Sequence, residues 1–79
     1  MDRNEALSKF TDNVVEVLAV DPSKVTLEAS FSDDLGADSL DLVELVMALE
    51  EAFDITVEET ELEDITTIGQ AFDLISAKL

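Results

Sequence analysis

The segment GADSLDLVELVMALEEAFD, from Gly36 to Asp54, has apolar residues on two opposite sides of a predicted helix. Successive residues of a helix are about 100° apart, because one turn takes 3.6 residues. One apolar set has the i, i+3, i+4, i+7 spacing of a buried face; this core stripe comprises Leu42, Leu45, Val46, Leu49 and Phe53. The opposite set, the outer stripe, comprises Leu40, Val43 and Met47, with Glu44, Glu50, Glu51 and Asp54 around it. Packing on one core requires only the core stripe, so the outer stripe needs another explanation.

Helices are also predicted on both sides of this segment, which itself is expected to be helical over residues 39–53. A first helix is predicted over residues 3–18 and stops before Asp21-Pro22, because the α region is disfavoured for the residue before proline. A last helix is predicted over residues 68–78, where Thr67 and Gln70 have the spacing of a capping box. The inner faces of these two helices comprise Leu7, Phe10, Val14, Val17 and Leu18 in the first, and Ile68, Ala71, Phe72, Ile75 and Leu79 in the last.

The segments between these helices are less regular. Residues 20–38 are predicted to form a long loop anchored in the core by Val25, Leu27, Phe31 and Leu35, and a short helix is predicted near residues 59–64. No strand-like alternation is present. The pattern therefore predicts an all-α fold in one domain, residues 1–79: a small up-down four-helix bundle of three longer helices and one short helix, with a long loop between the first two helices.

The chain is strongly acidic, with 20 acidic and 4 basic residues and a net charge of −16. Such a charge repels nucleic acids and anionic membranes and attracts basic protein surfaces. Disorder is not expected, because 47% of the residues are hydrophobic and many recur at helical spacing. No apolar run approaches the roughly 20 residues of a membrane span. We therefore expect a monomer whose partners are proteins, not nucleic acids or membranes.

The chain contains no Cys and no His, which removes the thiolate nucleophile, the commonest general base and the commonest transition-metal ligand. A catalytic role for Ser39 would need a base, and nothing in the sequence ties Lys24 to it. Adjacent acids such as Asp33 and Asp34 are what chance gives in so acidic a chain. We expect no catalytic residues and no metal site.

Ser39 has two interpretations on position alone. Either Asp38 or Ser39 can cap the helix that begins here, and capping is the simpler role for a serine. Alternatively, Ser39 accepts a group that another protein attaches. A phosphate at this position would meet free N–H groups and the positive end of the helix dipole, an interaction worth about 0.3–1 kcal/mol at an exposed site.

The run Gly36-Ala-Asp-Ser-Leu-Asp41, with the helix that follows it as far as Asp54, resembles the acyl carrier proteins. More narrowly, it is similar to the free-standing carriers of type II fatty acid synthesis in bacteria and plastids. Phe31-x-x-Asp34-Leu35-Gly36 and Asp64-Ile-Thr-Thr67 also fit, so the resemblance covers nearly the whole chain. Two departures are a missing proline in residues 55–59 and Ala52 in place of a common charge.

The resemblance implies that Ser39 carries 4′-phosphopantetheine, transferred from coenzyme A by a separate phosphopantetheinyl transferase. The chain would then be a non-catalytic carrier, whose imported thiol holds acyl intermediates of fatty acid biosynthesis as thioesters. Implied partners are ketosynthases, reductases, dehydratases and acyltransferases with basic docking patches, in the bacterial cytoplasm or in a plastid. Asp38 matches the family's acid beside the serine. The residues that match the family's recognition helix, also expected to meet partners, are Leu40, Asp41, Val43, Glu44, Met47, Glu50 and Glu51.

An attached acyl chain either lies on the surface or enters the bundle. For the second case, the residues expected to line its cavity, all on predicted inner faces, are Phe31, Leu45, Val46, Leu49, Leu62, Ile65, Ile68, Ala71 and Ile75. Two alternatives to a fatty acid carrier stay open. One is a carrier for a polyketide or another specialised acyl pathway, and the other is an acidic protein-interaction module without a prosthetic group.

Overall fold

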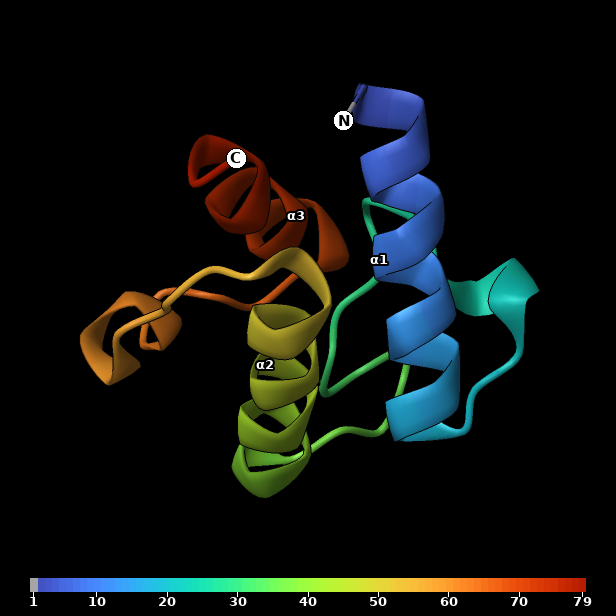
Figure 1. Cartoon of the computed structure of the whole chain (residues 1–79). Coiled ribbons are helices and arrows are strands. Elements are labelled where there is room, and N and C mark those ends of the chain that lie inside the picture. The colour runs from blue at the N-terminus through green and yellow to red at the C-terminus, as the bar shows by residue number, and fades with distance from the viewer. Residues whose placement is uncertain (1) are drawn as a thin grey trace.

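The computed structural model describes residues 2–79, which form three α-helices and two 3-10 turns (Figure 1). The elements are α1 (Arg3–Leu18), η1 (Pro22–Lys24), α2 (Ser39–Phe53), η2 (Glu59–Leu62) and α3 (Ile68–Ala77). α1 and α2 lie side by side, α3 packs near the end of α2, and η2 projects from the bundle on the side away from α1 (Figure 1). The all-α class is confirmed for residues 2–79, in which only one isolated β-bridge, Ser30 to Thr67, occurs. None of these helices is long and apolar enough to cross a membrane.

Side-chain caps fix where the helices begin. The Asp2 carboxylate accepts a hydrogen bond from the Glu5 N–H at 2.8 Å, so α1 starts at Arg3 as predicted. The predicted capping box of α3 is present: Thr67 Oγ1 accepts from the Gln70 N–H at 3.2 Å, and Gln70 Oε1 accepts from the Thr67 N–H at 3.1 Å. The bounds predicted for the first two long helices are confirmed, whereas α3 ends at Ala77, one residue early.

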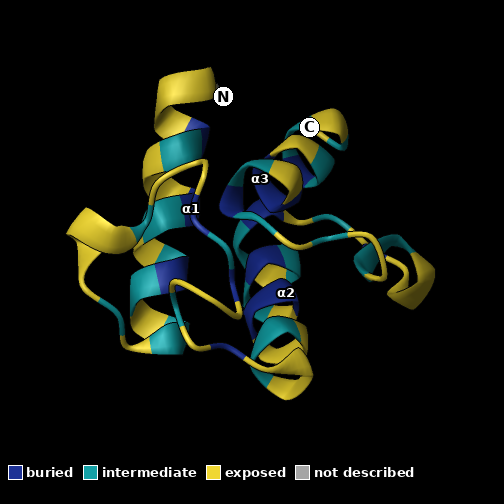
Figure 2. Cartoon of the chain, turned by 180° about the vertical axis from the view of Figure 1, so that it is seen from behind, coloured by how far each residue is buried: buried dark blue, intermediate teal, exposed yellow. Residues whose placement is uncertain are grey.

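The core lies between the three helices and is closed on one side by the long loop (Figure 2). Four members of the core stripe are buried, and Leu42, nearest the start of α2, is half-buried. Phe10 of α1 meets Phe72 of α3 edge to face, with ring centroids 5.5 Å apart. The largest fully buried side chains are Phe10, Phe72, Leu45, Leu49, Ile68, Ile75 and Val14.

Backbone hydrogen bonds attach the long loop to the start of α3. The Phe31 N–H donates to the Thr66 carbonyl at 3.0 Å, and the Gly69 N–H donates to the Leu27 carbonyl at 2.9 Å. A Cβ at Gly69 would lie 2.8 Å from that carbonyl oxygen, so this close approach requires glycine. The loop is therefore a packed wall of the bundle.

Three sequence expectations are wrong in detail. Leu27 is 46% exposed, and its backbone carbonyl, not its side chain, attaches the loop to α3; Ala29 and Ala37 are buried. Leu79 is 54% exposed, because it lies past the end of α3. The short third helix is the 3-10 turn η2, which stops at Leu62 and not at residue 64. Residues 58–64 contain five acidic side chains and no basic one. In an α-helix, acidic side chains three or four residues apart would repel one another, which disfavours a longer helix here.

Two basic side chains on α1 contact aromatic rings of the other helices. The Arg3 guanidinium lies 4.9 Å from the centre of the Phe72 ring, and Lys9 Nζ lies 5.2 Å from the centre of the Phe53 ring. These cation–π contacts link α1 to both α3 and α2.

Candidate functional site

Ser39 is the first residue of α2, and Asp38 is its N-cap. Asp38 Oδ1 accepts a hydrogen bond from the Asp41 N–H at 2.9 Å, and Asp41 Oδ2 accepts one from the Asp38 N–H at 3.3 Å. The cap is therefore Asp38, and a capping role for Ser39 is wrong. Within residues 2–79 the exposed Ser39 hydroxyl has no hydrogen-bond partner, so it is open to approach from solvent.

The turn before α2 directs Ser39 outward. Gly36 has a φ of 66°, a left-handed conformation that favours glycine. The Ala37 N–H then donates to the Phe31 carbonyl at 2.7 Å, and the Ala37 side chain is buried. With Ala37 fixed in the core, the next two residues emerge at the surface.

A hollow of about 180 Å³ lies next to Ser39, between the start of α2 and the segment before α3. Its walls are Phe31, Ser32, Ala37, Asp38, Ser39, Leu42, Ile65 and Thr66. Phe31 and Ile65 were expected to line an acyl cavity, whereas Leu42 was expected only in the core. Ser39 therefore borders a hollow whose walls include the apolar side chains of Phe31, Leu42 and Ile65.

A groove between α2 and η2 also begins at Ser39. It consists of two adjoining hollows of about 320 and 250 Å³, which share Val43, Glu59 and Leu62. We call it the α2–η2 groove; its other lining residues are Ser39, Leu42, Thr60 and Glu63 in the first hollow, and Val46, Met47, Glu50 and Val57 in the second. Of the residues expected around an acyl chain, Val46 and Leu62 line this groove. The remaining expected residues, Leu45, Leu49, Ile68, Ala71 and Ile75, lie in the packed core.

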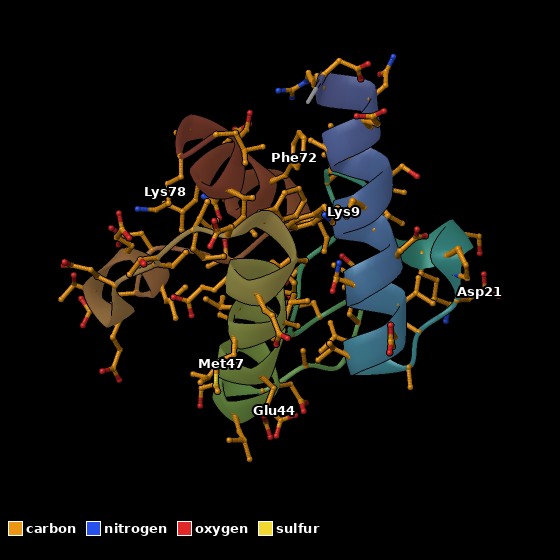
Figure 3. The ribbon with its side chains drawn as sticks, viewed as in Figure 1. Lys9, Asp21, Glu44, Met47, Phe72 and Lys78 are labelled. Carbon is orange, nitrogen blue, oxygen red and sulfur yellow. The ribbon has the colours of Figure 1, made fainter. Side chains whose placement is uncertain are left out.

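The outer stripe is exposed as its position on the helix predicts. Leu40 is 65% exposed, Met47 is 62% exposed and Val43 is 39% exposed. Glu44, beside Met47 on the surface of α2, and Glu51 are exposed acids of the same helix (Figure 3). Helix α2 therefore presents an apolar strip with acidic neighbours to the solvent.

Two of the acids expected to meet partners have structural contacts. Glu50 is half-buried, and its Oε2 accepts a hydrogen bond from the Val57 N–H at 3.0 Å, which holds the segment after α2. The Asp41 carboxylate accepts a hydrogen bond from the Asp38 N–H. The Asp-x-x-Asp spacing of the cap could have been recognised in the sequence, but the Glu50 contact spans seven residues of irregular chain and could not.

The turn η2, which borders the groove, contains a carboxylate with a perturbed pKa. The pKa of Glu61 is lowered from 4.5, first by the hydrogen bond that its carboxylate accepts from the Glu58 N–H and then by Lys78. Both interactions stabilise the ionised form. Among residues 2–79, no three side chains of the types that ligate metals lie close enough together to hold an ion.

Two comparisons with known proteins give matches that cover most or all of the chain. Residues 8–75 match the family model described as "Phosphopantetheine attachment site". The chain is 49% identical over 79 residues to a protein named "Acyl carrier protein" from Petrotoga mobilis (strain DSM 10674 / SJ95), an alignment that covers 100% of this chain and 93% of that protein.

Proposed function

This chain belongs to the acyl carrier protein family, and we propose that it carries intermediates of fatty acid biosynthesis on a 4′-phosphopantetheine group attached to Ser39. The observation that supports this site most directly is the exposed Ser39 hydroxyl, which has no hydrogen-bond partner within residues 2–79 and opens on two hollows. In this role the chain is a carrier and its partners perform the catalysis.

The start of α2 suits a phosphate ester. Within residues 2–79 the N–H groups of Ser39 and Leu40 have no acceptor, since the cap engages only the Asp41 N–H. These donors and the positive end of the helix dipole would stabilise a phosphate by about 0.3–1 kcal/mol at an exposed site. When attached, the group supplies a thiol that holds acyl cargo as a thioester, which a chain without Cys cannot supply itself.

The hollow beside Ser39 supports an inner location for the cargo. Its apolar walls are Phe31, Leu42 and Ile65. Phe31 is buried in the core, and Leu42 and Ile65 pack against the core. Each CH₂ group moved from water into apolar surroundings gains about 0.8 kcal/mol. We expect a short acyl chain to enter here and to widen the core along the nine residues expected from the sequence.

The outer stripe and its acids support docking by basic enzymes. Exposed Leu40, Val43 and Met47 offer apolar contact, and the exposed acids Asp38, Glu44 and Glu51 offer negative charge. Asp38 and Glu44 lie near Ser39, whereas Glu51 lies about three helical turns further along α2. Charges at the rim of an interface mainly set the encounter rate and specificity, while buried apolar contacts hold the complex. The transferase and the enzymes of the pathway would all need to approach this face, because Ser39 is at its end.

In vitro modification tests the proposal. Incubation with coenzyme A and a phosphopantetheinyl transferase should add one phosphopantetheine group, detected by intact mass. Ser39→Ala should gain none, and Ser32→Ala, a matched serine in the wall of the same hollow, should be modified as the parent is. Modification of the Ser39→Ala variant would show that the attachment site lies elsewhere.

A further inference from the structure

The turn η2 is one wall of the α2–η2 groove and stands apart from the bundle (Figure 1). Leu62, at its end, lines both hollows of the groove and is half-buried. No side chain of η2 is fully buried, so core packing alone holds it weakly. Contacts of η2 with other parts of the chain should therefore help to set the position of Leu62 and the width of the groove.

An ion pair joins η2 to the end of α3. Lys78 Nζ lies 3.1 Å from Glu61 Oε2, and the two side chains are only 26% and 33% exposed. Figure 3 shows Lys78 on the side of α3 where η2 lies. The other ion pair found within residues 2–79, Arg3 with Asp73, is 4.0 Å long and has side chains 62% and 75% exposed. The contact at η2 is thus the shorter and better shielded of the two.

Both ends of this contact are fixed to the backbone. The same Glu61 Oε2 accepts a hydrogen bond from the Glu58 N–H at 2.9 Å, so the carboxylate joins the start of η2 to its middle. Lys78 is the C-cap of α3, and its N–H donates to the Ile75 and Ser76 carbonyls. A displacement of η2 relative to the end of α3 must therefore break or stretch the Lys78–Glu61 contact.

We propose that Lys78 is a positioning residue: through Glu61 it holds η2, and with it Leu62, against α2, and so sets the width of the groove that begins at Ser39. Its effect on cargo rests on the proposed function, since the groove matters only when Ser39 bears an acyl group. Loss of the ion pair should loosen η2 and make the wall beside Ser39 easier to open.

Amide hydrogen exchange on the unmodified protein tests the contact itself. The reporters are the Glu58, Glu61 and Ile65 N–H groups, each hydrogen-bonded within this segment. Lys78→Gln and Glu61→Gln should each raise their exchange rates about two- to fivefold, the range expected for loss of a partly exposed ion pair. In Glu61→Gln the new side-chain amide oxygen can still accept from the Glu58 N–H, so this variant removes the charge and keeps the local turn.

Two controls separate positioning from general charge effects. Arg3→Gln makes the same change in net charge as Lys78→Gln, but at the exposed ion pair, and should leave the reporters unchanged. Lys78→Arg keeps the positive charge and should restore the parent rates. The proposal is overturned if Lys78→Gln leaves the reporters unchanged, or if Arg3→Gln accelerates them equally.

A second measurement tests the link to cargo. The rise in melting temperature on octanoylation should be larger in Lys78→Gln than in the parent, because the looser wall costs less to displace. An equal rise in both proteins would overturn the coupling of η2 to cargo. Failure of the parent to accept phosphopantetheine at Ser39 would instead contradict the proposed function, while the exchange experiment would still decide the role of Lys78.

Discussion

The side chains of Asp38 and Asp41 hydrogen-bond to each other's backbone N–H, at 2.9 Å to Asp41 and 3.3 Å to Asp38. Because this reciprocal cap uses the residues on either side of Ser39, the serine is left as an unbonded first residue of α2. The motif that contains the proposed attachment site therefore also starts the helix that presents it.

We predict that Asp38→Ala destabilises the protein by about 0.5–2 kcal/mol, the usual cost of losing an N-cap. Asp38→Asn should stay within a few tenths of a kcal/mol of the parent, because the Asn side-chain oxygen can still accept from the Asp41 N–H. Urea unfolding followed by circular dichroism measures both. Equal stability of the parent and the Ala variant would mean that the cap does not hold α2.

If basic partner enzymes dock on the outer stripe of α2, substitutions of two neighbouring side chains should have different kinetic effects. Glu44→Lys should slow association with a basic ketosynthase or transferase, with a defect that shrinks at high salt. Met47→Ala should raise the dissociation rate with little salt dependence, because it removes apolar contact. Surface-binding kinetics at two ionic strengths measure both rates.

A matched charge reversal controls the docking experiment. Glu16→Lys changes an exposed acid of α1, away from the outer stripe, and should bind partners nearly as the parent does. If Glu16→Lys slowed association as much as Glu44→Lys, overall charge and not the α2 face would govern encounter.

Glu50 and Glu51 are adjacent in the sequence, but their replacement by alanine should have different effects. Glu50→Ala removes the acceptor of the half-buried Val57 N–H contact and should cost about 1.5–3 kcal/mol of stability, as expected for a hydrogen bond to a charged group. Glu51→Ala should leave stability within about 0.5 kcal/mol, as expected at an exposed position, and slow partner association instead. Thermal unfolding and binding kinetics of the two variants measure these effects. Equal losses of stability in both variants would contradict the structural role assigned to Glu50.

The stability contributed by Glu61 should depend on pH. Its pKa in the folded protein is lowered from 4.5, so the folded state favours the carboxylate. The contribution is therefore fully present above about pH 4.5 and is lost as the pH falls through the lower folded value. The stability difference between the parent and Glu61→Gln should be constant near neutral pH and disappear in acid.

The neighbouring exposed residue Glu63 provides the control for this pH dependence. Glu63→Gln removes the same charge without touching Lys78, and so measures the general effect of charge on so acidic a chain. Unfolding curves of the three proteins across the acid range give the comparison. A difference between the parent and Glu61→Gln that persisted unchanged in acid would contradict the assigned contact.

The long helices could be predicted from the sequence because apolar periodicity and local caps agree there. Residues 3–18 and 39–53 are bounded by Asp2 and Asp38, whose capping contacts reach only three residues along the chain. The exposed outer stripe and the buried core stripe followed from the same periodicity. Local signals of this kind need no knowledge of the tertiary structure.

The irregular segments could not be predicted at the same level, because their conformation depends on distant contacts. Leu27 was expected in the core, yet its carbonyl accepts a hydrogen bond from the Gly69 N–H, 42 positions later in the chain. No pattern in the sequence indicates a contact between these two residues. The role of Glu50 depends on how residues 54–57 fold back over α2. Likewise, the Lys78–Glu61 contact appears only once α3 and η2 are packed.

The central claim, that Ser39 bears the prosthetic group, is tested most directly by mass spectrometry of the protein purified from its native host. We predict an intact mass that includes 4′-phosphopantetheine, free or acylated, and fragment ions that place it on Ser39. An entirely unmodified chain, or a group located on any other serine, would contradict the account.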